Sequence, residues 1–331
     1  MKAIVCTEWG PPSSLRLLEL PSPAPAPNQV LVRARVAAVN FPDALIVAGK
    51  YQFKPELPFS PGGELSGEII ACGSEVTRLA VGDKVVGITM FGAYSQEVLV
   101  DASNIIALPP ETGDADLELA GSFVLTYGTS LHALKDRAQA LSGETLLVLG
   151  AGGGVGLAAV EIGKLLGMRV IAAAASADER AAARERGADE TIDYVNEDLR
   201  ERIKQLTGGR GVDVVYDPVG GKLTETALRC VSWRGRYLVV GFAAGDIPKV
   251  AINLLLLKGS SLVGVFWGEF VRREPSLNAQ NMTLLFSWLH GRKIRPLISQ
   301  RFPLSHAAQA LEMLLARAAI GKLVILPQQV E

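Results

Sequence analysis

Apolar and polar positions follow two different patterns along this chain. Up to about residue 122, short runs rich in Val and Ile alternate with turn residues and with the Pro-rich segment Pro21–Pro27. This part shows no long helical periodicity, so we predict a compact β domain. The expected strands are Ala3–Cys6, Val30–Val39, Ser66–Cys72, Lys84–Ile88 and Ser95–Val100.

From about residue 122 onward, apolar runs of strand length alternate with segments in which apolar residues recur at helical spacing. This alternation predicts a parallel sheet covered by helices on both faces, which is the doubly wound α/β arrangement. Strands are expected at Leu146–Leu149, Arg169–Ala174, Thr191–Asp193, Val212–Tyr216 and Arg236–Val240, and helices at Gly156–Leu166, Asp178–Arg186, Glu197–Leu206 and Lys222–Val231.

The C-terminal part of the chain is predicted to leave this sheet and return to the β domain. A further strand, Ser261–Phe266, is expected at the edge of the sheet. We therefore divide the chain into a first domain, residues 1–122 completed by 268–331, and a second domain, residues 123–267. The elements expected after the edge strand are a helix at Asn278–His290, a strand at Leu297–Phe302, a helix at Ser305–Ala316 and a strand at Lys322–Leu326.

The segment Leu146–Gly156 is the strongest local signal. It has the pattern of a buried strand, a glycine-rich turn and the start of a helix, which together direct backbone N–H groups at one place. Gly153 would let a pyrophosphate approach the backbone, and Gly156 would let the helix pack closely on its strand, although Ala151 replaces the first glycine of the usual fingerprint. A tight loop without function is the alternative, but the order of elements favours a dinucleotide site. Its candidate residues are Gly152, Gly153, Gly154 and Val155.

Composition mainly excludes certain partners and locations. The 331 residues carry a formal net charge of −1 with both signs well mixed, so we expect no nucleic-acid partner. Cys6, Cys72 and Cys230 are far apart and lack metal-ligand spacing, which fits a reducing compartment without disulfides. The start of the chain is unlike a secretion signal, and the apolar run Leu254–Leu257 is too short to cross a bilayer. We predict a soluble cytoplasmic protein that does not bind membranes.

An ordered set of motifs covers nearly the whole chain. The motifs are Val39–Asp43, Pro58–Gly67, Val81–Asp83, Gly143–Glu144, the glycine turn and Tyr216–Gly220. Together they resemble the medium-chain dehydrogenase/reductase superfamily and, within it, the zinc-independent quinone oxidoreductase (zeta-crystallin-like) family. The resemblance implies an α/β fold, with a GroES-like β domain and a doubly wound Rossmann domain that binds a nicotinamide dinucleotide. It also implies that the protein is an oxidoreductase.

The sequence departs from the zinc alcohol dehydrogenases at the metal-binding positions. Those enzymes hold their catalytic zinc with Cys and His, whereas the corresponding positions here are Asn40 and Gly63. The lobe with four closely spaced cysteines is also missing. His132, His290 and His306 lie in predicted helical stretches, and we interpret them as packing or surface residues. We therefore expect no metal site.

The end of the second Rossmann strand bears on the choice of cofactor. An acidic residue there would bind the ribose 2′-hydroxyl of NAD, but Ala173–Ser176 stand at this point, so a 2′-phosphate would not be repelled. Arg180, with help from Ser176, is predicted to pair with that phosphate, which favours NADPH over NADH. Asp178 and Glu179 lie close by and are acidic residues that count against this choice, or else they are solvated acids at the start of a helix, which is the interpretation we favour.

Further cofactor and substrate residues follow from the resemblance. It implies that Tyr194 contacts the adenosine end and that the nicotinamide groove is lined by Asn40, Thr126, Val219, Gly241 and Phe242. Thr126 could equally be a helix cap. Tyr51 follows Ala-Gly-Lys at a position that is often aromatic in the family; its phenol would orient a carbonyl or pass a proton, or else form a pocket wall. Asp43 and Glu64 are interpreted as structural, Glu64 through pairing with a base such as an Arg.

Three functions remain open from the sequence. The favoured one is an NADPH-dependent quinone reductase in which the conjugated carbonyl accepts hydride without a metal, and Tyr51 and Asn40 are the candidate catalytic residues. The second is an enoyl reductase acting on an α,β-unsaturated ketone, aldehyde or thioester. The third is a crystallin-like protein that binds NADPH without turnover. By resemblance, we also expect a homodimer formed through the edge strand Ser261–Phe266, with Val263, Val265 and Phe266 giving that edge its apolar character.

Overall fold

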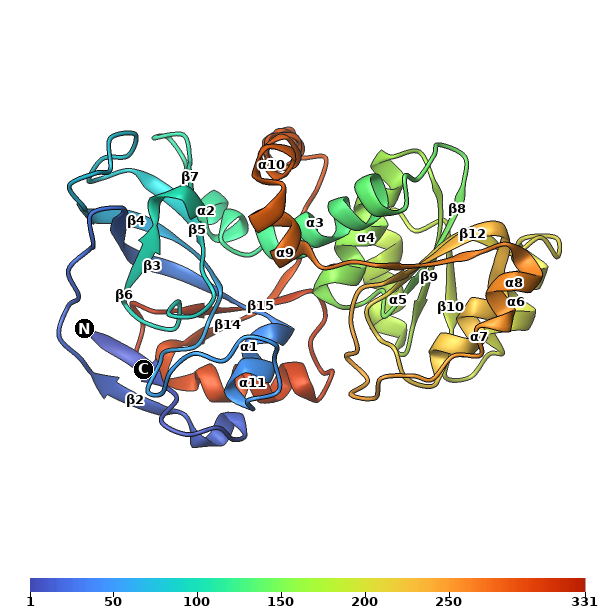
Figure 1. Cartoon of the computed structure of the whole chain (residues 1–331), viewed down its shortest axis with the longest axis horizontal. Coiled ribbons are helices and arrows are strands. Elements are labelled where there is room, and N and C mark those ends of the chain that lie inside the picture. Colours follow the sequence, from blue (N-terminus) through green and yellow to red (C-terminus); the bar gives the residue numbers. More distant parts are fainter. Residues whose placement is uncertain (331) are drawn as a thin grey trace. The chain divides into compact units, whose positions relative to one another are not determined.

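The computed structural model describes residues 1–330, which form two compact units (Figure 1). Unit 1 consists of Met1–Leu125 and the segment from Ile298 onward, and unit 2 is Thr126–Leu297. The chain thus returns to unit 1 at Ile298. The division differs for residues 268–297, which the sequence assigned to the first domain and which cluster with unit 2.

Unit 1 is built around one long strand, β3 (Gln29–Val39). Its first half pairs with β6, its last residues pair with β15, and β4 lies along its other side. The main sheet has the order β14-β15-β3-β4-β5-β7, with β6 on β3, and β1 and β2 form a separate two-stranded sheet. The other strands are β1 (Lys2–Val5), β2 (Arg16–Glu19), β4 (Glu64–Cys72), β5 (Lys84–Ile88), β6 (Glu97–Asp101), β7 (Ile105–Ala107), β14 (Ile298–Pro303) and β15 (Lys322–Leu326).

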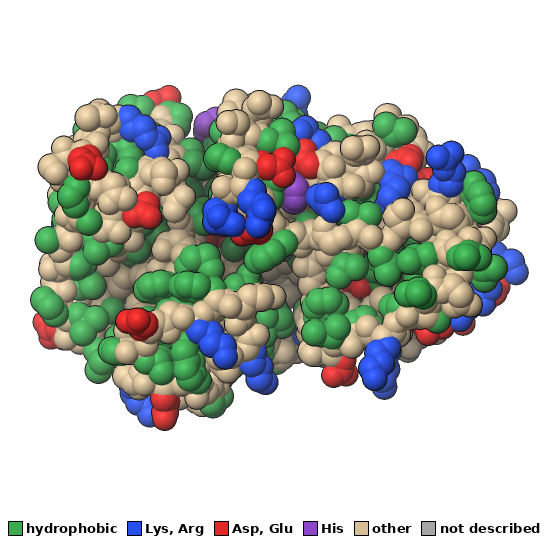
Figure 2. Space-filling view, in the orientation of Figure 1, with side chains coloured by type: hydrophobic (Ala, Val, Ile, Leu, Met, Phe, Trp, Pro, Cys, Tyr) green, Lys and Arg blue, Asp and Glu red, His purple; other side chains and the backbone are tan. Residues whose placement is uncertain are grey.

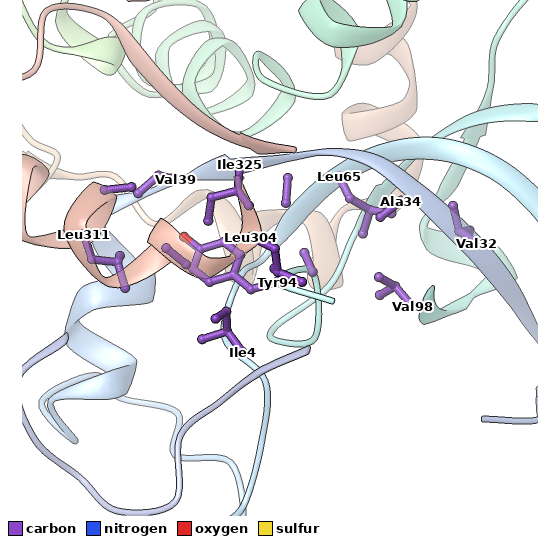
Figure 3. Packing of buried hydrophobic residues seen from close by; sticks show 14 of the residues in the cluster. Ile4, Val32, Ala34, Val39, Leu65, Tyr94, Val98, Leu304, Leu311 and Ile325 are labelled. Carbon is purple, nitrogen blue, oxygen red and sulfur yellow. The ribbon is translucent and has the colours of Figure 1, made fainter. Parts of the chain in front are cut away.

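Apolar side chains from both ends of the chain fill the core of unit 1. Figure 3 shows Ile4, Val39, Leu65, Tyr94, Leu304 and Ile325 within one cluster of packed side chains, and all of them are buried. Because β15 and α11 (Ala307–Leu315) supply part of this core, the C-terminal segment is an integral part of unit 1. The helical segments of unit 1 are η1 (Pro12–Ser14), α1 (Phe41–Val47), η2 (Ala102–Asn104), α2 (Asp114–Ala120), η4 (Leu304–His306) and α11 (Ala307–Leu315), and α3 (Val124–Leu131) begins in unit 1 and ends in unit 2.

Unit 2 contains a six-stranded sheet in which all neighbouring strands are parallel, in the order β10-β9-β8-β11-β12-β13. The central strand β8 (Thr145–Leu149) is buried along its whole length, as its unbroken apolar run predicts. The other strands are β9 (Arg169–Ala174), β10 (Glu190–Asp193), β11 (Val212–Asp217), β12 (Val231–Val239) and β13 (Ser261–Gly264).

The strand order of unit 2 reverses direction at β8. Successive crossovers run outward to β9 and β10 on one side, and then from β11 to β12 and β13 on the other. Right-handed crossovers therefore place helices on opposite faces, which confirms the doubly wound α/β prediction. The helices are η3 (His132–Arg137), α4 (Gly154–Leu165), α5 (Ala177–Glu185), α6 (Leu199–Leu206), α7 (Leu223–Cys230), α8 (Asn253–Lys258), α9 (Trp267–Arg273) and α10 (Pro275–His290).

Contacts of α9 and α10 explain why residues 268–297 cluster with unit 2. The ring of Phe270 stacks on His132 with 3.9 Å between centroids. The amide of Asn281 donates a 2.8 Å hydrogen bond to Asp136 and accepts another from Lys135. These buried polar and ring contacts depend on tertiary packing, and no local sequence pattern predicts them. They also account for His132 as a packing residue.

One of the two edge strands of the unit 2 sheet is β13, as predicted for this segment. Leu262 and Phe266 are partly or largely exposed beside this edge, and Leu256 on α8 is 79% exposed. On the face shown in Figure 2, basic and acidic side chains are interspersed rather than gathered by sign. Among residues 1–330, no helix has both the length and the hydropathy needed to span a bilayer.

Candidate dinucleotide and substrate site

The glycine turn of unit 2 joins β8 to α4 at the carboxyl edge of the sheet. A methyl group on Gly156 would lie 2.2 Å from the Gly150 carbonyl oxygen, so only glycine lets the helix approach the turn this closely. A methyl group on Gly153 would meet its nearest atom, the Gly150 carbonyl oxygen, at 3.6 Å, which is an ordinary van der Waals contact, so this position is not crowded. The helix start thus presents free backbone N–H groups beside an uncrowded glycine. This geometry suits the pyrophosphate of a dinucleotide.

Two further strand ends contribute to the same edge. A methyl group on Gly150 would lie 2.8 Å from the Val219 side chain, which follows β11, and a methyl group on Gly220 would touch the Phe242 ring, which follows β12. The buried Asp217 carboxylate holds this region by accepting hydrogen bonds from the N–H groups of Val219 (2.8 Å) and Gly220 (2.9 Å). Val219, Phe242 and the adjacent Gly241 therefore line the point where the strand order reverses, where doubly wound sheets bind ligands.

The segment after β9 begins α5 with a reciprocal cap. The Glu179 N–H donates to the Ser176 hydroxyl (3.2 Å), and the Glu179 carboxylate accepts from the N–H groups of Ala175 and Ser176 (2.9 Å each). The Arg180 guanidinium forms an ion pair with Asp193 (3.0 Å) and donates to the Ala175 carbonyl (3.1 Å). The two residues predicted to bind a 2′-phosphate thus lie at the expected strand end, and both already have partners.

The remaining predicted residues of unit 2 have well-defined positions. Tyr194 directly follows β10 and packs, partly buried, against the core of the unit. Thr126 lies in α3 and is buried. Gly152, Gly154 and Val155 belong to the turn and first helical turn described above. Unit 2 thereby brings the predicted adenosine and pyrophosphate residues, with Val219, Gly241 and Phe242, from five strand ends to one edge of its sheet.

In unit 1, three polar residues meet at the ends of neighbouring strands. Asn40 directly follows β3, Glu64 is the first residue of β4, and Lys322 is the first residue of β15. Since β3 pairs with both β4 and β15, the three side chains come together although Asn40 and Lys322 are 282 positions apart. All three are at most 4% exposed.

These three side chains fix one another. The Lys322 ammonium donates to the Asn40 Oδ1 and lies 3.5 Å from a Glu64 carboxylate oxygen. The Asn40 Nδ2 donates to the Glu64 Oε2 (3.0 Å), and the Glu64 Oε1 accepts from the Leu125 N–H (3.0 Å). Because an ammonium only donates and a carboxylate only accepts, the Asn40 amide has a single orientation. One Nδ2–H of Asn40 remains for another partner.

Asp43 extends this buried cluster. Its Oδ2 accepts from the Asn40 N–H (2.8 Å) and from the Tyr94 hydroxyl (2.9 Å). Burial raises the pKa of Asp43 to about 6, in spite of these hydrogen bonds and of the nearby Lys322 charge. Burial also lowers the pKa of Lys322, while the Glu64 and Asp43 charges oppose this shift. We call Asn40, Asp43, Glu64, Tyr94 and Lys322 the buried polar cluster.

Tyr51 is partly buried against the core of unit 1. Its pKa is raised above the usual tyrosine value, first by burial and then by the Asp43 charge, so the phenol stays protonated at neutral pH. Its hydroxyl makes no hydrogen bond to residues 1–330 and is available to a ligand. Nor do those residues gather three His, Cys, Asp or Glu side chains that could hold a metal ion.

The sequence did not identify two residues of the buried polar cluster. Lys322 is the base that pairs with Glu64, and Tyr94 is the donor to Asp43. The signal for Lys322 was a charged residue opening an otherwise apolar strand, Lys322–Leu326, because an unpaired Lys is very seldom buried. The alternation pattern gave no signal for Tyr94, which is one of several aromatic residues in the β domain.

A glycine turn at the reversal point of a six-stranded parallel sheet, joined to a β domain with a buried polar cluster, defines a two-domain, nucleotide-dependent dehydrogenase or reductase. Family profiles agree: "Alcohol dehydrogenase GroES-like domain" matches residues 26–110, and "Zinc-binding dehydrogenase" matches residues 154–283.

Full-length relatives narrow the class. The chain is 35% identical to quinone oxidoreductase-like protein 2 homolog of Nematostella vectensis, covering 99% of this chain and 89% of that protein. It is 37% identical to quinone oxidoreductase of Pseudomonas aeruginosa, covering 98% and 99%. The crystal structure of Escherichia coli quinone oxidoreductase complexed with NADPH is 30% identical, with a TM-score of 0.90 and coverage of 99% and 100%. The chain therefore belongs to the quinone oxidoreductase family of the medium-chain dehydrogenase/reductase superfamily.

Proposed function

We propose that this protein is an NAD(P)H-dependent quinone oxidoreductase that passes hydride to a quinone or a similar conjugated carbonyl without a metal. The glycine turn carries the proposal, because it combines an uncrowded Gly153 with a close-packed Gly156 at the sheet edge. Membership of the quinone oxidoreductase family supports the acceptor.

For this reaction the protein has mainly to bind the coenzyme and the acceptor and to orient them. The bound nicotinamide supplies the hydride, and the conjugated acceptor takes up the resulting charge on its own oxygen. Asn40 keeps one amide N–H unused by the buried polar cluster, and this N–H is suited to hold a carbonyl oxygen. Tyr51 offers a protonated phenol to the oxyanion that forms.

NADPH is the cofactor predicted from the sequence, and the NADPH complex of the E. coli relative supports it. Ser176, Arg180 and Tyr194 lie at the strand ends where the adenosine end of a dinucleotide would bind. The Arg180 guanidinium is ion-paired with Asp193 through its Nη1 (3.0 Å), so a 2′-phosphate would share this guanidinium with a carboxylate.

An acceptor panel tests the function. Initial rates of NADPH and NADH oxidation are measured with an ortho-quinone, a para-quinone, a simple enone and an enoyl thioester. The proposal expects rapid turnover with the quinones and slow turnover with the enone and the thioester. Faster turnover of the enone or the thioester would contradict the proposal and indicate an enoyl reductase. Coenzyme binding without coenzyme oxidation by any acceptor would indicate a non-catalytic role.

We further propose a homodimer that pairs the β13 edges of two copies. The edge is unpaired in the single chain, and the exposed Leu262 and Phe266 beside it would be covered by a second copy. Light scattering at micromolar concentration should give twice the mass of 35.1 kDa. A monomer mass would contradict the proposed pairing, and Leu262→Asp should dissociate the dimer if the pairing is correct.

A further inference from the structure

Glu179 lies directly against the glycine turn. A methyl group on Gly152 would be 2.3 Å from the Glu179 Cγ and 2.5 Å from its Cβ, so the stem of Glu179 covers the Cα of Gly152. This position differs from the interpretation of Glu179 as a fully solvated acid at a helix start, since the residue is only partly exposed. A carboxylate thus stands between the turn that would hold the pyrophosphate and the end of β9.

The Glu179 carboxylate uses the anion-binding groups at that strand end. Its Oε2 accepts from the N–H groups of Ala175 and Ser176, and the Ser176 hydroxyl is bonded to the Glu179 N–H. A phosphate at this place would compete for the same two N–H groups, although the Ser176 hydroxyl, which accepts from the Glu179 N–H, keeps its own O–H to donate. It would therefore have to displace an anion that the protein itself supplies. The Glu179 Oε1 has no partner among residues 1–330 and remains able to accept from a ribose hydroxyl.

The local charge balance points in the same direction. Asp178, Glu179 and Asp193 are acidic, and Arg180 is the basic residue among them. The Arg180 guanidinium is held by Asp193 and by the Ala174 and Ala175 carbonyls, so its positive charge is already compensated. A group with close to two negative charges is disfavoured here, whereas an uncharged ribose hydroxyl is not.

We infer that Glu179 is a coenzyme-specificity residue that weakens binding of a 2′-phosphate, so that this protein binds NADH about as tightly as NADPH. The inference rests on the proposed function in so far as a nicotinamide dinucleotide is the ligand. Because Ala173–Ser176 stand at the strand end, the sequence predicted no group there that would repel a 2′-phosphate, and Glu179 supplies such a group. The role comes from a helix residue three positions after the cap, rather than from the strand end itself.

Calorimetric titration of the protein alone tests this inference without any acceptor. The ligands are NADPH and NADH, together with 2′,5′-ADP and 5′-AMP, which isolate the 2′-phosphate. In the wild type, the dissociation constants of NADPH and NADH should lie within tenfold of each other. Glu179→Gln keeps an acceptor for the Ala175 and Ser176 N–H groups but removes the charge. It should tighten 2′,5′-ADP relative to 5′-AMP by about tenfold, as expected for a divalent anion a few ångströms from a solvated charge.

Asp178→Asn is the matched control, because Asp178 carries the same charge one residue earlier, is exposed and does not contact Gly152. It should change the ratio of the two ligands by less than twofold. Equal shifts in the Glu179 and Asp178 variants, or a wild-type preference for NADPH above a hundredfold, would overturn the inference. These constants are obtained whether or not a quinone is reduced, so a failed acceptor panel and a failed specificity assignment are told apart.

Discussion

The two polar regions of this protein are built in opposite ways. In unit 1, strand pairing brings together the uncharged and charged side chains of the buried polar cluster, although Asn40 and Lys322 lie far apart in sequence. Lys322 and Glu64 are almost completely buried. In unit 2, the turn and the α5 cap are formed by residues close in sequence, and they act through glycines and backbone N–H groups. In the first region, the charged groups can stay buried only because tertiary structure pairs them with one another. The second region depends mainly on local geometry.

This difference predicts different consequences of mutation. A charge removed from the buried polar cluster leaves its partner unpaired in a dry environment, so the fold should suffer first. A charge changed at the end of β9 remains next to solvent, so ligand preference should change while stability stays nearly constant. Five single substitutions test this contrast, from the largest expected effect to the smallest.

Lys322→Met should cause the largest loss of stability. The substitution leaves the Glu64 carboxylate without its ammonium and the Asn40 Oδ1 without its donor. We expect the free energy of unfolding in denaturant to fall by about 3–5 kcal/mol. The double variant Lys322→Met with Glu64→Gln should recover at least half of this loss. A loss below 1 kcal/mol in the single variant would show that the cluster is not held by charge pairing.

Asp43→Asn should change how stability depends on pH. The pKa of Asp43 is about 6 in the folded protein, compared with 3.8 for the unperturbed carboxyl, so the folded state holds this proton more tightly. The native state then binds more protons than the unfolded state between these values, and wild-type stability falls as pH rises through this window. The contribution of Asp43 to this fall is about 3 kcal/mol.

Thermal unfolding of both proteins from pH 4 to pH 7 measures this contribution. The stability of wild type relative to Asp43→Asn should decrease as pH rises from 4 to 6 and level off above it. A difference that stays constant over the whole range would contradict the raised pKa.

Two glycine substitutions separate packing from binding in the turn. Gly156→Ala places a methyl group 2.2 Å from the Gly150 carbonyl oxygen, which should lower the free energy of unfolding by about 1–3 kcal/mol. Gly153→Ala meets no protein atom nearer than 3.6 Å and should leave stability within about 0.5 kcal/mol. It should still weaken dinucleotide binding measured by calorimetry, because its methyl group fills the open face of the turn. Equal stability losses in both variants would mean that the turn does not distinguish these roles.

Tyr51→Phe should have the smallest effect on the fold and a moderate effect on catalysis. The phenol has no hydrogen-bond partner among residues 1–330, so the midpoint of unfolding should not move. Turnover at saturating quinone should fall about tenfold, equivalent to about 1.4 kcal/mol, if the phenol donates to the forming oxyanion. Unchanged turnover would assign Tyr51 to the pocket wall only.

The sequence predicted what depends on local pattern. The strands of the parallel sheet and the glycine turn follow from runs of apolar residues and from the order of elements, and the structure places Val219, Gly241 and Phe242 at strand ends beside the turn. The short helices α1 and α2 were not predicted, because seven residues are too few to show a helical period.

Partners that meet through tertiary structure could not be predicted. The pairing of Lys322 with Glu64 requires the antiparallel contact of β15 with β3, which no local pattern reveals. The same holds for the ion pair that binds Arg180 to Asp193, and for the position of Glu179 over Gly152. The sequence therefore indicated where the adenosine end would bind, but not which charges face it.

The most direct test of the proposed function is hydride transfer in protein freed of metals. The protein is dialysed against EDTA, loaded with reduced coenzyme deuterated at the transferring position, and mixed rapidly with a para-quinone while coenzyme absorbance is followed. Metal-independent hydride transfer predicts that chelation leaves the rate unchanged and that deuterium slows it. A rate that is lost on chelation and restored by zinc, or no coenzyme oxidation at all, would contradict metal-independent hydride transfer to a quinone.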